Sequence, residues 1–219
     1  MWSSEVTNMI ITGIWETLYM TLVSTLVGYV IGLPMGIILT VSDKDGIKPN
    51  AVLYKILDVI ANIVRSVPFI ILLVLLIPFT RLVVGKSYGS TATIVPLVIA
   101  AAPYIARMVE SSLKEVDAGV NEAARSMGAS NFTIITKVML VEARTSLLVG
   151  ATITLGTILG YSAMSGAVGG GGLGAIAIRY GYTRWQTDIM IVTVILLIIL
   201  FQIFQTVGMK LADKFDHRK

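Results

Sequence analysis

The sequence predicts an all-α integral membrane protein with about five membrane-spanning helices. The first reason is composition: 55% of the 219 residues are hydrophobic and 14% are charged, whereas a soluble domain is about 25% charged. The second is that the chain contains several apolar tracts close to the roughly 20 residues that a spanning helix needs. The third is that Lys and Arg gather in alternate connections between these tracts, as in membrane proteins of fixed orientation.

Four tracts contain no Asp, Glu, Lys or Arg, and they cover residues 17–42, 87–106, 145–178 and 189–209. A fifth tract, 66–80, is shorter and lies between Arg65 and Arg81, whose long side chains can snorkel from helix ends. Extending it back to Ile60 completes a span and places Arg65 near its cytoplasmic end. The 145–178 tract is too long for one helix. Its glycine run, Gly169–Gly172, predicts a helix to about Ala163 followed by a loop or re-entrant stretch.

Glycines repeat at four-residue spacing in two of the tracts. Gly28, Gly32 and Gly36 lie in the first, and Gly156 and Gly160 lie in the fourth. Small residues at this spacing allow two helix backbones to approach closely. Packing within the chain is the favoured interpretation, and a seam between two copies is the alternative.

Charge asymmetry predicts the orientation. With five spans, one set of connections carries thirteen Lys and Arg residues, from Lys44 to Lys219, and the other carries only Arg81, Lys86, Arg179 and Arg184. The positive-inside rule then places the N-terminus outside and the C-terminus in the cytoplasm. The net charge of +4 is explained by these cytoplasmic connections and does not require nucleic acid as a partner.

The chain offers no catalytic or metal-binding constellation. It has no cysteine, and its single histidine is His217. The one Gly-Lys pair is Gly85-Lys86, and Thr80 stands where a phosphate-binding loop needs its first glycine. We therefore expect no directly bound cofactor and no ATP hydrolysis by this chain alone. The carboxylates fall at loop or span ends, which argues against a secondary transporter, because such proteins usually bury ionisable groups in the membrane.

The most informative segment is 107–144, which contains ten of the thirty charged residues. Residues 121–127 predict a short helix rich in good helix formers, and Gly128 suits the left-handed residue that ends it. Ser130 or Asn131 can cap a following helix through Leu140. On these observations alone, the segment is a solvated helical hairpin.

The order of residues in this hairpin resembles the EAA motif of ABC importer permeases. Glu122-Ala123-Ala124 is followed by three residues, Gly128, nine residues and Val138-Met139-Leu140. In that family the motif forms a coupling helix that docks on an ATPase subunit. The resemblance implies a coupling loop at about 114–144, with Glu122, Ala123, Ala124, Gly128 and Ala129 as its docking residues. Val141 stands where the family usually has proline, which changes the helix exit and leaves the docking residues intact.

Further stretches are similar to the methionine-importer permeases: Arg65–Phe69, Ala102–Arg107, Gly160–Met164 with Gly169–Gly174, and Arg179–Tyr182. The resemblance implies one permease domain over residues 1–219 with the five-helix core of type I importers. It also implies a cell-membrane homodimer that moves methionine or a related amino acid by alternating access. Its partners would be two cytoplasmic ATPase subunits that bind ATP and Mg²⁺, an extracytoplasmic substrate-binding (lipo)protein, and membrane lipid.

Two groups of residues are candidates for the substrate pathway. Tyr161, Ser162, Met164 and Ser165 combine polar groups and a flexible thioether beside a glycine-rich backbone, and packing against a neighbouring helix is the alternative. The second group is Arg65 with Ser66 and Pro68. Arg65 either faces the inner mouth of the pathway or satisfies backbone carbonyls freed by Pro68. The alternative is that it only anchors the span by snorkelling to the membrane surface. Other functions left open are a permease for another amino acid or small peptide, a secondary transporter and a membrane scaffold.

Overall fold

The computed structural model describes residues 4–216, so His217, Arg218 and Lys219 lie outside the described part. The described chain is helical, with no strand between residues 4 and 216. Its elements are α1 (Ser4–Ser42), α2 (Ala51–Ser66), α3 (Phe69–Leu75), α4 (Ile77–Val84), α5 (Ser90–Lys114), α6 (Ala118–Ser126), α7 (Asn131–Thr133), a π-helical turn (Ile134–Met139), α8 (Leu140–Glu142), α9 (Arg144–Ser165), a 3-10 turn (Gly166–Val168), α10 (Gly172–Ile176), a second π-helical turn (Ala177–Tyr182) and α11 (Thr187–Lys214).

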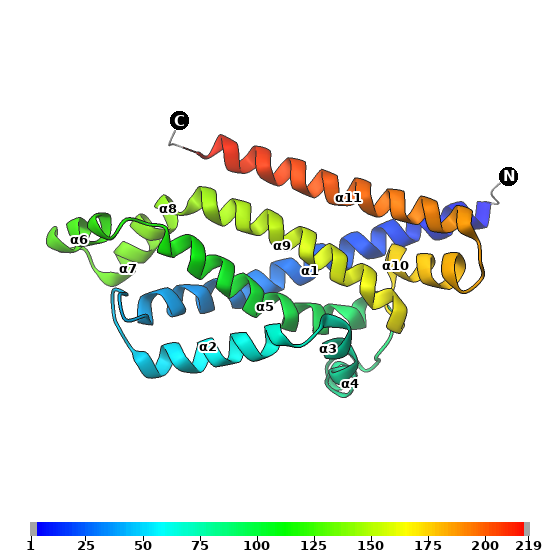
Figure 1. Ribbon diagram of the computed structural model, residues 1–219, viewed down its shortest axis with the longest axis horizontal. Helices are drawn as coiled ribbons and strands as arrows, with labels where there is room; N and C mark the ends of the chain where they lie inside the picture. The colour runs from blue at the N-terminus through cyan, green and yellow to red at the C-terminus, as the bar shows by residue number, and fades with distance from the viewer. Residues whose placement is uncertain (1–3, 217–219) are drawn as a thin grey trace.

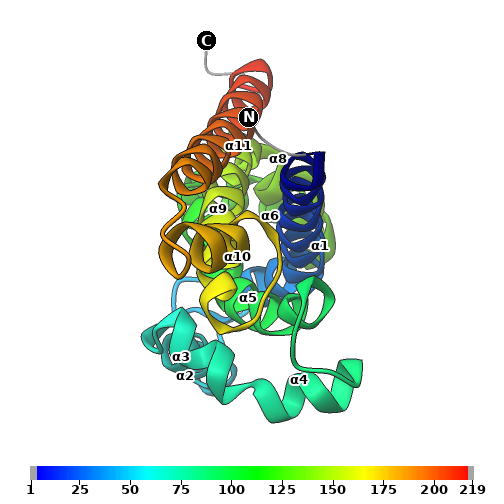
Figure 2. The ribbon, with the colours of Figure 1, turned by 90° about the vertical axis from the view of Figure 1, so that its right-hand side faces the viewer.

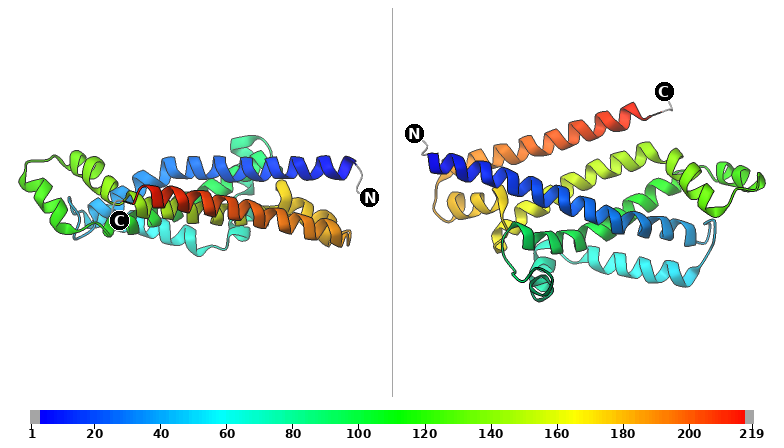
Figure 3. Two further views of the ribbon diagram at one scale, coloured as in Figure 1. Left: turned by 90° about the horizontal axis from the view of Figure 1, so that it is seen from above. Right: turned by 180° about the vertical axis from the view of Figure 1, so that it is seen from behind.

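The long helices run along one axis, and α1 begins toward one end of it while α11 finishes toward the other (Figure 1). The α6–α8 loop lies at the end where α11 finishes. We call the opposite end, where α1 begins and α10 lies, the far end. Seen from above, α1 and α11 extend along much of the molecule (Figure 3). A chain that starts at one end and finishes at the other crosses between the two ends an odd number of times.

The predicted fold class is confirmed. Within residues 4–216, four helical stretches are long and apolar enough to span a membrane: Ser4–Ser42, Ser90–Lys114, Arg144–Tyr182 and Thr187–Lys214. The pair α2 and α3 makes a fifth candidate. At 1.5 Å per residue, the 39-residue α1 is about 58 Å long. It therefore exceeds the roughly 30 Å hydrocarbon core of a bilayer.

The second span is not the straight helix expected from the sequence. A bend of 102° separates α2 from α3, because a residue before proline is pushed out of the helical region and Val67 is extended (φ −84°, ψ 124°). Figure 2 shows α3 and α4 running across the bundle. Since α2 already begins at Ala51, Arg65 lies about 21 Å along it. The expectation that Arg65 sits near the cytoplasmic end of this span is therefore wrong.

The glycine stripe of α1 packs within the chain. A Cβ atom added to Gly32 would lie 2.6 Å from the carbonyl oxygen of Ala102 in α5, and one added to Gly36 would lie 2.6 Å from that of Ala106. These are backbone contacts, so α1 and α5 touch through their main chains. The intramolecular interpretation is confirmed for this stripe. In α9, by contrast, a Cβ atom on Gly160 would meet nothing within 4 Å.

The long fourth tract is a broken helix. Helix α9 ends at Ser165, close to the expected end, and a short turn and glycine loop follow, as predicted. The chain then resumes a helix from Gly172 to Tyr182, through α10 and the second π-helical turn. We call Gly172–Tyr182 the distal segment. Gly169 and Gly172 have φ values of 84° and 79°, which favour glycine.

Candidate functional site

The end of α6 forms the turn that the sequence predicts. Gly128 has φ 81°, its N–H donates to the carbonyl of Arg125 (3.0 Å), and the Ala129 N–H donates to the carbonyl of Ala124 (3.1 Å). This pair of bonds is a Schellman motif, which satisfies the last carbonyls of a helix and reverses the chain. The left-handed conformation predicted for Gly128 is confirmed.

The next helical stretch begins with a side-chain cap, also as predicted. The Ser130 hydroxyl accepts a bond from the Thr133 N–H at 3.2 Å, so Ser130 rather than Asn131 is the cap. The stretch continues through the π-helical turn and α8 to Glu142. Ile134 and Met139 of that turn are buried, which holds the hairpin against the bundle.

The surface of the hairpin is divided between a packed side and an open tip. Ala124 is 5% exposed and belongs to the core, whereas Glu122 and Ala123 are exposed. Met127 and Phe132 are apolar yet 82% and 76% exposed. Sequence reasoning missed these two residues, although apolar residues flanking a helix-ending glycine in a polar loop were a usable signal. Two large apolar side chains in water at a loop tip indicate a contact surface.

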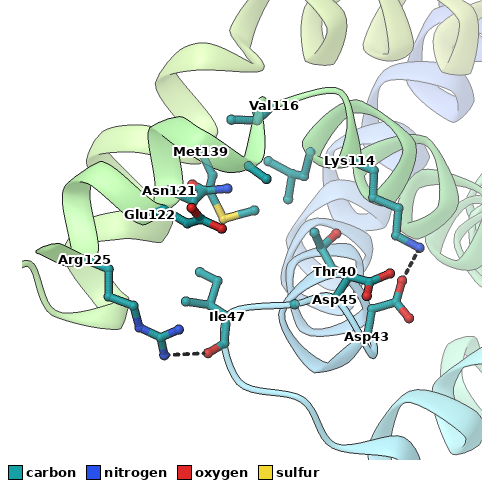
Figure 4. Close-up of a pocket in the computed structure, with 13 residues that line it drawn as sticks. Thr40, Asp43, Asp45, Ile47, Lys114, Val116, Asn121, Glu122, Arg125 and Met139 are labelled. Carbon is teal, nitrogen blue, oxygen red and sulfur yellow. Dashed lines mark hydrogen bonds and ion pairs between the residues drawn. The ribbon is translucent and has the colours of Figure 1, made fainter.

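Helix α6 also contacts the loop between α1 and α2. Arg125 donates to the carbonyl of Ile47 at 3.0 Å. A cavity of about 530 Å³ lies between these elements and is lined by charged groups that include Asp43, Lys114 and Glu122 (Figure 4). The α1–α2 loop is therefore in direct contact with α6.

A network of charged groups lies behind this cavity. Glu110 of α5 is 4% exposed and accepts bonds from Arg107 Nη1 (2.7 Å), Lys114 Nζ (2.8 Å) and the Tyr54 hydroxyl (3.2 Å). Arg107 also pairs with Asp58 in the middle of α2. A buried carboxylate is stable only when paired in this way. The network therefore fixes α2 against α5.

Lys114 extends the network to the end of α1. Its Nζ atom lies 2.6 Å from the Asp43 carboxylate. The hydrogen bond from Lys114 is the largest cause that lowers the pKa of Asp43, which follows α1 directly. Helices α1, α2 and α5 are thus joined by ion pairs at the end that carries α6.

The expectation that every carboxylate lies at a loop or span end is wrong for Asp58. It failed because the sequence placed the start of the second span at about Ile60, whereas α2 begins at Ala51. Asp58 is nevertheless paired with Arg107, so it is no isolated charge. Among residues 4–216, no group of three His, Cys, Asp or Glu side chains could hold a metal ion.

A second cavity lies where α2, α3, α5 and α9 meet. Its volume is about 160 Å³, and its lining includes Arg65, Phe69, Tyr104 and Tyr161. The Phe69 and Tyr161 rings stack with centroids 4.5 Å apart, and the Arg65 guanidinium carbon lies 6.0 Å from the centre of the Tyr104 ring. Two predicted pathway residues, Arg65 and Tyr161, are thus brought together from separate spans.

The neighbours of Arg65 have local roles. The Ser66 hydroxyl donates to the carbonyl of Asn62 at 2.7 Å, and the Pro68 carbonyl accepts bonds from the first turn of α3. No hydrogen bond joins the Arg65 guanidinium to a carbonyl of residues 4–216. The structure therefore does not support the interpretation that Arg65 satisfies backbone carbonyls freed by Pro68. Its exposed guanidinium remains available to a ligand.

The four candidates of α9 separate into two pairs. Ser162 and Ser165 are fully buried, and their hydroxyls donate to the carbonyls of Leu159 (2.8 Å) and Ser162 (2.6 Å). This geometry favours packing for the two serines. Met164 is 53% exposed and Tyr161 is half-buried, so only this pair is accessible to a passing molecule.

Comparison with known proteins agrees with these features. Residues 28–218 match the family model described as binding-protein-dependent transport system inner membrane component. A relative from Vibrio cholerae, named probable D-methionine transport system permease protein MetI, is 49% identical over 217 residues, covering 99% of this chain and 96% of the relative. The D-methionine transport system permease protein MetI of Escherichia coli is 51% identical over 158 residues, 72% of this chain and 73% of that protein.

Solved structures give the same fold. A chain from inward-facing conformations of the MetNI methionine ABC transporter has a TM-score of 0.97 and 49% identity, covering 99% of this chain and 100% of that one. A chain from an amino acid ABC transporter crystallised with histidines has a TM-score of 0.73 at 22% identity, and this likeness concerns the fold alone. The first comparison covers the α6–α8 hairpin and the distal segment together.

Proposed function

This chain belongs to the family of binding-protein-dependent transport system inner membrane components, and we propose that it is the permease subunit of an ATP-driven importer for methionine or a related amino acid. The observation that carries this proposal is the α6 hairpin. It ends in a Schellman turn at Gly128 and projects from one end of a membrane bundle. The extent of identity with D-methionine permeases supports methionine as the substrate.

The hairpin is suited to dock on a cytoplasmic ATPase subunit. Exposed Met127 and Phe132 offer apolar anchors on either side of the turn. Ala123, Gly128 and Ala129 complete the docking set because they are small enough to let a groove approach the backbone, and the exposed Glu122 can pair with a basic residue of the partner. Ala124 supports this surface from inside the core. Two such ATPase subunits would bind ATP and Mg²⁺, and this chain would bind neither.

Movement of the hairpin can reach the membrane helices by direct contacts. Arg125 bonds the α1–α2 loop, and the pairs of Lys114 with Asp43 and Glu110 join α1 to α5. In the proposed mechanism, closure of the ATPase dimer displaces α6, and these contacts carry the displacement into the spans. The pathway then opens outward to receive substrate from an extracytoplasmic binding (lipo)protein.

The cavity beside Arg65 is our candidate for part of the substrate pathway. Its 160 Å³ is below the roughly 300–1,000 Å³ of complete ligand pockets, which fits one half of a site that a second copy of the chain completes. The Arg65 guanidinium can bind a carboxylate, and Tyr161 can contact an apolar side chain in the cavity. Met164 lies outside this lining but is exposed on the same helix, where it can contact a passing apolar side chain.

The decisive experiment is purification of the chain with its candidate ATPase, followed by uptake in liposomes. We expect a complex in which substrate-loaded binding protein stimulates ATP hydrolysis and methionine uptake. Competition by other amino acids and short peptides would identify a different substrate. Uptake without the ATPase would instead support a secondary transporter, and a complex without any uptake would support a scaffold.

Orientation requires a separate test, and the absence of cysteine from the chain gives a clean background for it. We propose that the N-terminus lies outside and the C-terminus in the cytoplasm. A Thr183→Cys variant at the far end should react with an impermeant thiol reagent in intact cells. A Ser126→Cys variant on α6 should react only after permeabilisation, and labelling of it in intact cells would overturn the proposed orientation.

A further inference from the structure

A pair of side chains on α1 caps the distal segment at the far end. The Gly172 N–H donates to a Glu16 carboxylate oxygen at 2.6 Å, and the Leu173 N–H donates to the Thr17 hydroxyl at 2.9 Å. Each bond joins residues 156 positions apart. Successive residues of one helix thus meet successive amides of another.

The distal segment cannot supply this cap itself. The first amides of a helix have no partner within the helix, and a side chain of the preceding residue normally accepts one of them. Here that residue is Gly171, which has no side chain. Glu16 replaces it with a charged acceptor, and bonds to charged groups are about twice as strong as neutral ones. A carboxylate is also favoured at the positive end of the helix dipole.

The Thr17 hydroxyl has a defined direction. It donates to the carbonyl of Gly13 at 2.8 Å, so its hydrogen is engaged and a lone pair faces the Leu173 amide. The approach is also close. A Cβ atom on Gly171 would lie 2.6 Å from Glu16 Oε2, and one on Gly172 would lie 2.5 Å from Thr17 Oγ1. Glycine is favoured at position 172, where φ is 79° and α1 comes this close.

On its other side, the segment packs against α9, because a Cβ atom added to Gly174 would collide with the backbone of Ala163. The glycine loop between them is also held by a bond from the Gly170 N–H to the Ser165 carbonyl at 2.9 Å. Backbone packing on α9 and the side-chain bonds from α1 therefore both contribute to the orientation of the distal segment. Within the described chain, only α1 supplies side-chain acceptors for its first two amides.

We propose that Glu16 is a positioning residue which, with Thr17, clamps the distal segment to α1, so that the two move as one body when the permease changes conformation. This inference rests on the proposed transport function for the conformational change, but the effect of Glu16→Ala on the clamp can be measured without any transport. It adds a mechanical connection at the end of the molecule opposite to the α6 hairpin.

The test measures a distance across the clamp. Spin labels at Thr12→Cys on α1 and Ile178→Cys on the distal segment report it by electron paramagnetic resonance. We expect one narrow distance, unchanged between the nucleotide-free and ATP-trapped complexes. Glu16→Ala should broaden it, whereas Glu5→Ala, which removes a charge from the same helix without touching the segment, should not. Amide exchange in the peptide 169–176 should rise about tenfold or more with Glu16→Ala, as expected for a lost charged bond.

Several results would overturn the clamp. The first is a distance between the two labels that changes between the nucleotide-free and ATP-trapped complexes when Glu16 is intact. The second is a distance distribution that stays narrow in Glu16→Ala. The third is an amide exchange rate in 169–176 that is the same with and without Glu16. If Glu16→Ala fails to insert, Thr17→Val provides the same readouts with the charge retained. Uptake by the labelled chain with intact Glu16 separately tests the proposed function, so loss of transport there is not confused with loss of the clamp.

Discussion

Replacing Glu110 by alanine tests whether the buried ion network holds α5 against its neighbours. Glu110 is 4% exposed and accepts three hydrogen bonds, from Arg107, Lys114 and Tyr54. Glu110→Ala removes all three at once. The two cations then remain in a partly buried site with less negative charge around them.

The magnitude follows from what each partner retains. Removing one member of a buried ion pair typically costs about 3–5 kcal/mol, because the other charge is left uncompensated. Here Arg107 keeps Asp58, and Lys114 keeps Asp43, so we expect the low end, about 3 kcal/mol. One kcal/mol lowers the melting temperature of a 150–250-residue domain by about 2–4 °C. The expected decrease is therefore about 6–12 °C.

Thermal unfolding of the detergent-purified permease measures this effect. Glu115→Ala is the matched control, since it removes the same charge from an exposed position five residues along the chain. Its melting temperature should stay within about 2 °C of the wild type. A Glu110→Ala protein as stable as the Glu115→Ala control would refute the idea that the network stabilises the bundle.

Three further predictions follow from single sites. Gly32→Ala should lower the melting temperature, because its Cβ would meet the α5 backbone at 2.6 Å, whereas Gly160→Ala, with nothing within 4 Å, should not; equal effects would contradict the packing argument. Gly128→Val should weaken binding of the ATPase in copurification about 5–30-fold, which corresponds to about 1–2 kcal/mol of left-handed backbone strain. Gly128→Asn should bind nearly normally, because asparagine tolerates this conformation. An equal loss of binding in both variants would contradict backbone strain as the cause. The bond from Lys114 lowers the folded-state pKa of Asp43, so its stabilisation is present above the unfolded value of about 3.9 and is lost as pH falls through the folded pKa. The difference in melting temperature between wild type and Asp43→Asn should therefore disappear in acid, and a difference independent of pH would contradict this linkage.

Features with a local cause were predictable from sequence. The apolar tracts appear as spans because a membrane helix must be apolar along its own length. Gly128 and Ser130 take their predicted conformations because a helix ending and a helix cap depend on a few consecutive residues. The break in the fourth tract was visible for the same reason, since four consecutive glycines, Gly169–Gly172, disfavour a continuous helix.

Partners across the bundle were decided only by the tertiary structure. The pairing of Asp58 with Arg107 and the stacking of Phe69 on Tyr161 join residues from separate helices. A single sequence states which groups need partners, but the approach of two helices selects them. The depth of Arg65 is a different case, because it depends on α2 beginning at Ala51 rather than at about Ile60, and the length of an apolar tract does not show how far a helix continues through charged residues.

The sequence by itself thus determined that this chain is a helical membrane protein with a capped helical hairpin, because composition and short-range spacing set those properties. The assignment of the hairpin to a permease came from its resemblance to the EAA motif. The tertiary structure alone decided that the α1 glycines face α5, that Ser162 and Ser165 are buried, and that Glu16 caps a segment 156 residues away. The physical reason is that an amide without a partner in its own helix, or a glycine without a Cβ, is a local property of the sequence. The group that bonds the amide or packs on the glycine is supplied by whichever helix lies beside it in the folded chain.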